Sequence, residues 1–216
     1  MDIAIAGAHG QIARRLTRLL TARGDRVRGI IRNDEQVEDV LSDGAEPVVL
    51  DLEYAIPANV AEAIHGCDAV VFAAGAGPGS GATRKETVDY GAAVKLLEAA
   101  QDAGVSRYVM VSAMGIDEPP DGDDVFSVYL RAKAKADEEL MASGLAWTVV
   151  RPGGLTDDQG TGRVTLQRHV DGGKISRDDV AAVLVATLNE PATAGAVFEV
   201  VGGDTPIEQA VAQITS

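Results

Sequence analysis

The fold is decided by residues 2–13, which read Asp2-Ile3-Ala4-Ile5-Ala6-Gly7-Ala8-His9-Gly10-Gln11-Ile12-Ala13. Residues 2–6 predict a short buried strand, and the glycines that follow predict a turn. From Ile12 to Leu20 the apolar residues recur at helical spacing, which predicts a helix that ends at Gly24. A strand, a glycine turn and a helix in this order are the context in which a dinucleotide-binding fingerprint is credible.

Each small residue of the turn has a physical role in such a fingerprint. Gly7 permits the tight turn, Gly10 lets the backbone approach a pyrophosphate, and Ala13 allows the helix to pack close to the sheet. The free N–H groups at the start of the helix then face the phosphates. We therefore expect a nucleotide site that includes Gly7, His9, Gly10, Gln11 and Ile12.

Composition excludes several classes of function. The chain has 216 residues, 46% of them hydrophobic, and predicts a single globular domain over residues 1–216. Its net charge of −14 argues against a nucleic-acid partner, which requires a basic face. No apolar run approaches the ~18 residues of a membrane span, and no signal region is evident.

The number and spacing of cysteine and histidine residues bear on disulfides, cellular location and metal binding. Cys67 is the single cysteine, so no internal disulfide can form and a reducing, cytoplasmic location is expected. No cluster of His and Cys has the spacing of metal ligands, so we expect no metal. The expected partner is a small-molecule substrate, and the expected state is a monomer or homodimer.

Strand and helix patterns alternate along the whole chain, which predicts an α/β fold: a Rossmann-type, doubly wound parallel sheet with helices on both faces. The further strands are expected at Arg26–Ile31, Glu46–Leu50, Ala69–Ala73, Arg107–Val111, Trp147–Arg151 and Val197–Val201. The further helices are expected at Gln36–Ser42, Ala58–His65, Arg84–Asp102, Val125–Ser143, Asp178–Leu188 and Ile207–Ile214. Loops rich in Gly, Pro and Asp should gather at the carboxyl ends of the strands, where ligands bind: Gly75–Ala82, Asp117–Asp124 and Pro152–Gly162.

The ends of strands two to four offer candidate cofactor contacts, and the end of strand two favours NADP over NAD. Where an NAD site usually offers a carboxylate, this chain has Arg32, whose planar guanidinium suits a 2′-phosphate, although a solvated arginine is the alternative. Asp51, followed by Leu52, can accept a hydrogen bond from adenine or cap a helix. The small residues Ala73, Ala74 and Gly75 let the backbone lie against a ribose, or simply form a tight turn.

A catalytic pair is predicted on the helix after the fifth strand. Tyr129 and Lys133 are four residues apart and therefore share one helix face, where the ammonium is expected to lower the phenol pKa. An interface tyrosine beside a solvated lysine is the alternative. The fifth strand ends at Val111-Ser112, which places a hydroxyl near this pair.

The chain resembles the short-chain dehydrogenase/reductases, in particular their atypical branch, which is epimerase/dehydratase-like or NmrA-like. The resemblance covers nearly the whole chain and rests on these motifs: Gly7–Ala13, Arg32, Asp51-Leu52, Ala73–Gly75, Val88–Ala92, Val111-Ser112, Tyr129-x-x-x-Lys133, Arg151–Leu155 and Ile175–Ala181.

This resemblance implies roles for particular residues. Tyr129 and Lys133 match the family's proton-transfer pair, and Asp89 matches the aspartate that the atypical branch carries where other members have Asn. A first-turn helix residue is the alternative for Asp89. Ser112 takes the place of the serine, although many relatives have the catalytic hydroxyl one residue later, where this chain has Ala113. The remaining contacts implied with the cofactor are Val111, Lys133, Pro152, Gly153 and Gly154.

The resemblance leaves three functions open. The first is an NADP-dependent oxidoreductase that exchanges hydride with a small carbonyl or alcohol, under a small lid formed by about residues 152–174 and the C-terminal tail. The second is a redox sensor that binds NADP(H) without turnover, as NmrA-like proteins do. The third is a flavin or biliverdin-type reductase, which would not need Tyr129.

Overall fold

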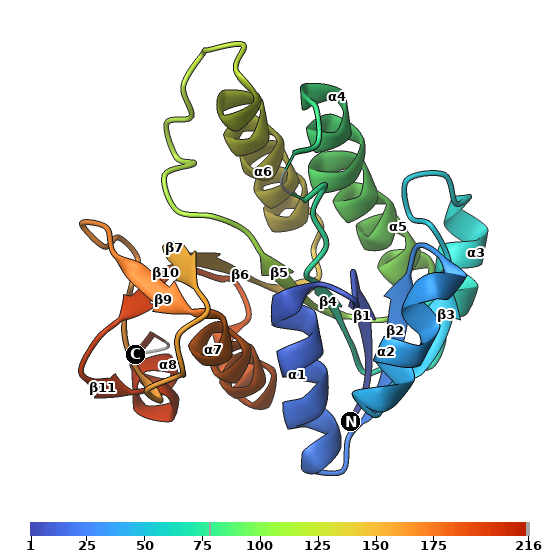
Figure 1. Ribbon diagram of the computed structural model, residues 1–216, viewed down its shortest axis with the longest axis horizontal. Helices are drawn as coiled ribbons and strands as arrows, with labels where there is room; N and C mark the ends of the chain where they lie inside the picture. The colour runs from blue at the N-terminus through green and yellow to red at the C-terminus, as the bar shows by residue number, and fades with distance from the viewer. Residues whose placement is uncertain (78, 215–216) are drawn as a thin grey trace.

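The computed structural model describes residues 1–77 and 79–214, and it has a layered α/β architecture (Figure 1). Pro78 of the predicted loop Gly75–Ala82 and the last two residues of the predicted domain lie outside the described residues. Along the described part of the chain, no helix is long and apolar enough to cross a membrane.

The central sheet has nine strands among the described residues, in the order β11-β8-β10-β6-β5-β4-β1-β2-β3. Strands β3, β2, β1, β4, β5, β6 and β10 pair in parallel, as predicted, while β8 is antiparallel to β10 and to β11. The bounds are Asp2–Ala6 for β1, Arg26–Ile31 for β2, Glu46–Val49 for β3, Ala69–Phe72 for β4, Arg107–Val111 for β5, Ala146–Pro152 for β6, Arg163–Gln167 for β8, Ala196–Gly202 for β10 and Thr205–Pro206 for β11.

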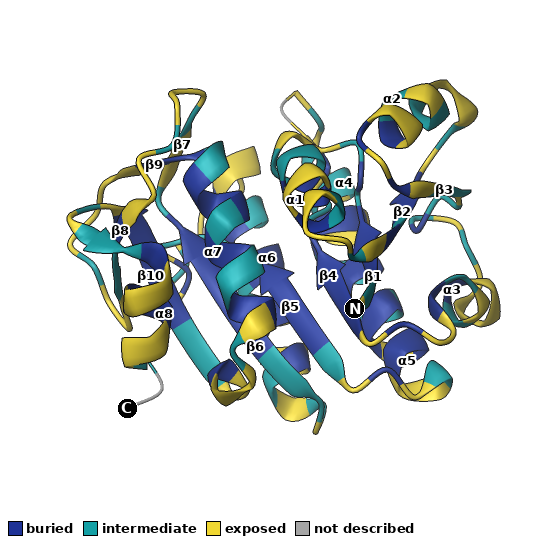
Figure 2. Cartoon of the chain, turned by 90° about the horizontal axis from the view of Figure 1, so that it is seen from below, coloured by how far each residue is buried: buried dark blue, intermediate teal, exposed yellow. Residues whose placement is uncertain are grey.

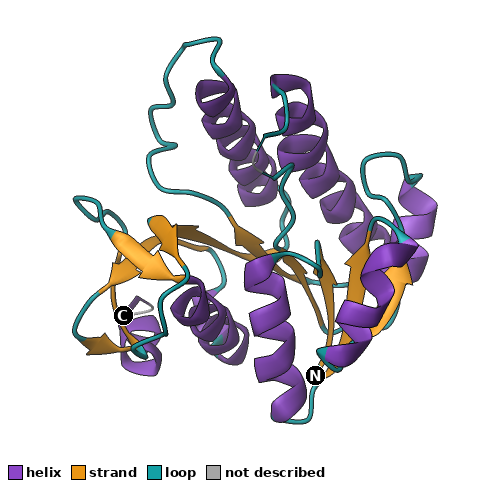
Figure 3. Cartoon of the chain, viewed as in Figure 1, coloured by secondary structure: helices purple, strands orange, loops and turns teal. Residues whose placement is uncertain are grey.

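Helices cover both faces of this sheet, as predicted (Figure 3). One face carries α1 (Gln11–Ala22), α7 (Arg177–Asn189) and α8 (Ile207–Ile214), with α2 (Val37–Ser42) beside α1. The other face carries α3 (Pro57–Ile64), α5 (Ala93–Ala103) and α6 (Val125–Ala142). The short helices are α4 (Ala82–Arg84), η1 (Asp34–Gln36) and η3 (Pro191–Thr193).

The two faces of the sheet bury separate cores because alternate residues of each strand point to opposite sides. Ile3 and Ile5 of β1 pack toward Leu16 and Leu20 of α1, whereas Ala4 and Ala6 belong to the core beneath α3, α5 and α6. The inner strands β1, β2, β4, β5, β6 and β10 are buried along most of their length, and the outer helix faces are exposed (Figure 2). The sheet is therefore a rigid platform for the loops at its edge.

One predicted helix is wrong in its geometry. Residues 84–102 were expected to form one α-helix, but the structure has a π-helix, η2 (Lys85–Ala92), before α5 begins. The wider turn brings Val88, Asp89 and Ala92 to the buried side of the helix. Segments of π-helix occur frequently at functional sites, and this one carries a predicted catalytic residue, Asp89.

The predicted lid, residues 152–174, contains strands that the sequence did not reveal. Strand β8 extends the main sheet as an antiparallel neighbour of β10. A separate two-stranded sheet joins β7 (Gly154–Thr156) to β9 (Lys174–Ser176). Part of this segment is therefore fixed in the sheet, and whether the rest covers a bound substrate remains a prediction.

Candidate cofactor and active site

The candidate site lies at the carboxyl edge of the sheet, where the strand order reverses. Strands β1 and β4 are neighbours, yet α1 follows β1 on one face and η2 follows β4 on the other. The chain therefore opens a crevice between the loops that follow these two strands, the position at which ligands bind in open α/β sheets.

A first cavity of about 240 Å³ lies beside the glycine turn. Its lining includes these predicted cofactor residues: Gly7, His9, Gly10, Arg32, Asp51, Leu52, Ala73, Ala74 and Gly75. Gly7 has φ +78°, and a Cβ atom there would lie 2.6 Å from Ala74 Cα. The turn can thus pack against the loop after β4 only because Gly7 lacks a side chain.

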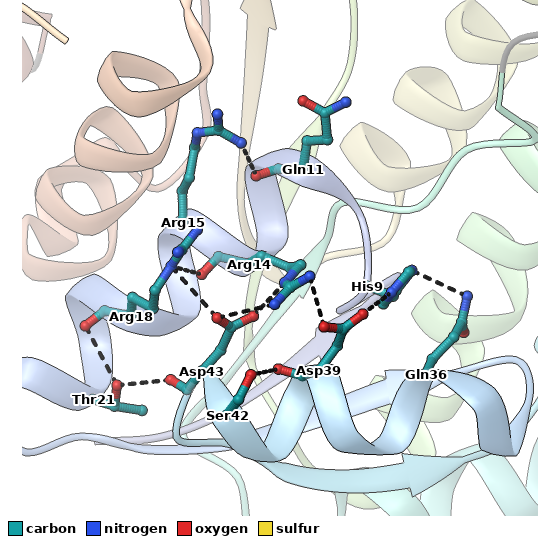
Figure 4. Close-up of polar contacts among 10 residues, drawn as sticks. All are labelled: His9, Gln11, Arg14, Arg15, Arg18, Thr21, Gln36, Asp39, Ser42 and Asp43. Atoms are coloured by element: carbon teal, nitrogen blue, oxygen red, sulfur yellow. Dashed lines mark hydrogen bonds and ion pairs between the residues drawn. The ribbon is translucent and has the colours of Figure 1, made fainter. Parts of the chain in front are cut away.

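The turn is anchored to the segment after β2 by a polar network (Figure 4). His9 Nε2 lies 2.8 Å from Asp39 Oδ2, and His9 Nδ1 lies 3.3 Å from Gln36 Nε2. Arg14 of α1 pairs with the same Asp39 at 3.1 Å and donates to Asp43 at 2.5 Å. The network offsets the charge of both carboxylates and fixes the rim of the first cavity.

Arg32 stands at this rim, one residue after β2. Its backbone N–H donates to Gln36 Oε1 at 3.2 Å, which fixes its backbone. Its exposed guanidinium has no hydrogen-bond or ion-pair partner within residues 1–77 and 79–214. The guanidinium therefore lies beside the cavity without a carboxylate that would neutralise it.

Asp51 does not cap a helix, since the next helix, α3, begins at Pro57 with Ile56 as its N-cap, and its contact with adenine stays a prediction. It lines the first cavity, and its Oδ1 accepts a hydrogen bond from the Glu53 N–H at 3.0 Å, so it also stabilises the local turn. Asp51 Oδ2 accepts no hydrogen bond from the described part of the chain. One carboxylate oxygen is therefore available to a ligand.

A second cavity, of about 360 Å³, adjoins the first. Its lining includes these predicted residues: Asp89, Val111, Ser112, Tyr129, Lys133, Pro152 and Gly153. Both cavities are lined by Ala73, Ala74, Gly75 and Gly77, so one wall of small residues is common to them. Gln11, Ile12 and Gly154 were also predicted to contact the cofactor, but they line neither cavity; Gln11 and Gly154 are exposed.

Lys133 is held between the two helices that flank the second cavity. Its Nζ lies 3.5 Å from Asp89 Oδ1 of η2 and donates to the Val111 carbonyl of β5 at 3.2 Å. Asp89 is 1% exposed and also accepts from the Ala76 N–H at 3.2 Å. The structure therefore places Asp89 in contact with Lys133 of the predicted catalytic pair, which the sequence alone could not decide.

The expected effect of Lys133 on Tyr129 is corrected by the structure. The pKa of Tyr129 is raised above its ordinary value because burial disfavours the phenolate. Lys133 opposes this increase, but Asp89 and Asp137 add to it. The sequence showed the cation at i+4 but neither the burial nor the two carboxylates.

Ser112 lies in the second cavity, as predicted, but its hydroxyl is not engaged. The residue is 6% exposed, and its Oγ has no hydrogen-bond partner within the described residues.

Lys85 also lines this cavity, although the sequence did not indicate it. Its Nζ lies 5.3 Å from the centre of the Tyr129 ring. Its position depends on the π-helix, for which no sequence signal was recognised.

A separate cleft of about 810 Å³ lies near the end of β6 and contains a group of possible metal ligands. Asp117, His169 and Glu199 offer one ligand atom each, and these atoms all lie within 4.8 Å of one another. Residues this far apart in sequence give no recognisable spacing. Arg151 pairs with Asp117 at 2.7 Å, and its positive charge opposes the binding of a cation there.

Comparison with known proteins places this geometry in a family. The family model described as NAD(P)H-binding matches residues 7–191. The chain belongs to the NAD(P)H-binding family. A relative from Bacillus subtilis (strain 168), named as an uncharacterized sugar epimerase, YhfK, is 40% identical over 215 residues, which cover 99% of this chain and 100% of the relative.

Solved structures of similar proteins share the fold over nearly the full length of this NAD(P)H-binding family member. A Bacillus halodurans protein, provisionally named as an NAD-dependent epimerase/dehydratase, has a TM-score of 0.92 at 38% identity, with 99% of each chain covered. The oxidoreductase YlbE from Lactococcus lactis has a TM-score of 0.88 at 28% identity, with 99% of this chain and 96% of that chain covered. The fold and the dinucleotide-binding family predicted from the sequence are confirmed.

Proposed function

We propose that this chain is an NADP-dependent oxidoreductase of the atypical short-chain type, which exchanges hydride with a small carbonyl or alcohol. The observation that carries the proposal is the wall Ala73–Gly75, common to two cavities. One cavity adjoins the glycine turn and Arg32, and the other adjoins Tyr129 and Lys133. A dinucleotide that lies along this wall would reach both.

The residues present fit such a cofactor. A Cβ atom at Gly10 would lie 3.1 Å from the Gly7 carbonyl oxygen and 3.6 Å from that of Ala73, so a side chain there would fill the floor between the two loops. We assign Arg32 and Asp51 to the adenosine half and the N–H groups at the start of α1 to the pyrophosphate. Pro152 and Gly153 would hold the nicotinamide half.

NADP(H), when bound, supplies or accepts the hydride. In the direction of carbonyl reduction, the Tyr129 hydroxyl donates its proton to the substrate oxygen, which leaves a phenolate on Tyr129. The Lys133 ammonium stabilises this phenolate by charge attraction. Asp89 and the Val111 carbonyl hold Lys133 in place, so the cation is positioned before the phenolate forms.

The preference for NADP is tested by measuring the affinity for both cofactors. We expect NADPH to bind at least ~10-fold more tightly than NADH, a difference of about 1.4 kcal/mol, because the Arg32 guanidinium is available for the 2′-phosphate. Calorimetric titration of the wild type and of Arg32→Ala measures it. Arg168→Ala is the matched control, since Arg168 is also exposed but lines the separate cleft.

Equal affinities for the two cofactors would refute the assignment of Arg32. The same conclusion follows if Arg32→Ala keeps the preference. A loss of preference in Arg168→Ala would show that general surface charge, and not one positioned arginine, selects the cofactor.

The reaction itself is tested by following NADPH oxidation with a panel of quinones, aldehydes, ketones and flavins. Turnover of a carbonyl compound supports the proposal. Tight NADPH binding without turnover of any member of the panel would favour the sensor instead. Flavin reduction that persists in Tyr129→Phe would favour the flavin-type reductase, in which no phenolic proton is needed.

A further inference from the structure

Asp137 continues the line of polar residues that Tyr129 and Lys133 begin on α6. Tyr129, Lys133 and Asp137 follow one another at intervals of four residues and therefore share one face of the helix. Asp137 is fully buried, and its Oδ2 accepts a hydrogen bond from Arg151 Nε of β6 at 3.0 Å. This arrangement places a carboxylate directly behind the proposed proton-transfer pair.

Two polar atoms at this place are buried without a hydrogen-bond partner among the described residues. One is Asp137 Oδ1, and the other is Ser112 Oγ, which belongs to the second cavity. Buried polar atoms are almost always paired, because leaving one unpaired costs free energy. Strands β5 and β6 pair with Val111 beside Val150, and the Ser112 N–H donates to the Val150 carbonyl, so Ser112 lies next to Arg151, the residue that holds Asp137. The Ser112 hydroxyl also lowers the pKa of the Asp137 carboxyl, against the larger effect of burial.

We propose that Asp137 positions the Ser112 hydroxyl, which donates its proton to the Asp137 carboxylate and therefore faces the cavity as a hydrogen-bond acceptor. An ionised carboxylate can only accept, so the single hydroxyl proton of Ser112 is used up by this bond. The lone pairs of Ser112 then suit the O–H of an alcohol. Protonation of Asp137 reverses the bond and frees the hydroxyl to donate to a carbonyl oxygen. Asp137 is thus a positioning residue, and its role rests on the proposed function of the site.

The surroundings of Asp137 place this reversal close to neutral pH. Burial raises the pKa of Asp137 to about 6, against the opposing effect of the Arg151 charge. Lys133, on the same helix, also lowers it. Burial raises the pKa of the phenols of Tyr108 on β5 and Tyr129 on α6, and the charge of Asp137 adds to both increases. Arg151 in turn pairs with Asp117 at the edge of the separate cleft.

The direction of the bond is tested by measuring the pKa of Asp137 directly. The side-chain carboxyl of Asp137 is followed by carbon-13 NMR in the intact protein, with the resonance assigned through the backbone so that no Asp137 variant is needed. Loss of a donor to the ionised form raises a carboxyl pKa. We therefore expect Ser112→Ala to raise the pKa of Asp137 by about one unit. Ser112→Thr, which keeps a hydroxyl, should restore the wild-type value.

Thr17→Ala is the matched control, because Thr17 Oγ1 is likewise buried without a hydrogen-bond partner in the described chain but lies on α1, in contact with the other face of the sheet. This variant should leave the Asp137 titration unchanged. An unchanged pKa in Ser112→Ala would overturn the proposal, and a lowered pKa would show that Ser112 accepts from Asp137 instead. The titration needs neither cofactor nor substrate, so its failure is distinguishable from a failure of the proposed oxidoreductase activity.

Discussion

The replacement Asp137→Asn should change the pH dependence of stability in a calculable way. The pKa of Asp137 rises from 3.8 to about 6 on folding, because the buried site disfavours the carboxylate. The proton on Asp137 therefore stabilises the fold fully below about pH 4, and this contribution is lost as the pH rises through about 6. A difference of about two pKa units corresponds to roughly 3 kcal/mol.

Because the asparagine of the variant does not titrate, the difference in unfolding free energy between the two proteins isolates this group. Urea unfolding of the wild type and the variant between about pH 4 and about pH 7 measures the difference. We expect it to shift by roughly 3 kcal/mol in favour of the variant as the pH rises. Carboxyls with lowered pKa values, such as Asp25 and Asp178, change stability in the opposite direction, but they are present in both proteins. A flat difference would refute the reasoning.

Three further predictions follow from the site and its supports. Gly10→Val should abolish NADPH binding in a titration while the circular dichroism spectrum is retained, because the added side chain fills the floor between the glycine turn and the loop after β4. Undiminished binding would place the nucleotide elsewhere. Lys133→Ala should raise the pKa of Tyr129 further and move the basic limb of the pH–rate profile upward; an unmoved limb would separate Lys133 from the phenol. Ser176→Ala should destabilise the protein by about 1 kcal/mol in urea, because the hydroxyl caps α7 through the Asp179 N–H; a value near zero would show that the cap is dispensable.

Local chemistry explains why much of the fold was predictable. Strands β1, β2 and β5 begin and end at the predicted residues, because each ends in apolar residues and is followed by glycine or a polar residue. Gly24, which the sequence predicts to end the first helix, has a positive φ of +91°. In these places the local sequence and the tertiary structure favour the same conformation.

The remaining features depend on contacts between distant segments. The π-helix that carries Asp89 and Lys85 has no pattern that separates it from an ordinary helix. Strand β8, Arg163–Gln167, has a short alternation of polar and apolar residues, but its partner β10 comes much later in the chain, so its place in the sheet could not be predicted locally. The pKa of Tyr129 depends on burial and on Asp137, neither of which the Tyr-x-x-x-Lys spacing discloses.

The central claim is that Tyr129 transfers a proton to a substrate oxygen beside bound NADPH. The measurement that tests it most directly compares Tyr129→Phe with the wild type, using the carbonyl compound that the panel identifies and an independent titration of NADPH. We expect kcat to fall by roughly 10²–10⁴ while the affinity for NADPH changes little, because the phenol acts on the substrate and not on the phosphates. An undiminished rate of carbonyl reduction in Tyr129→Phe would contradict the account.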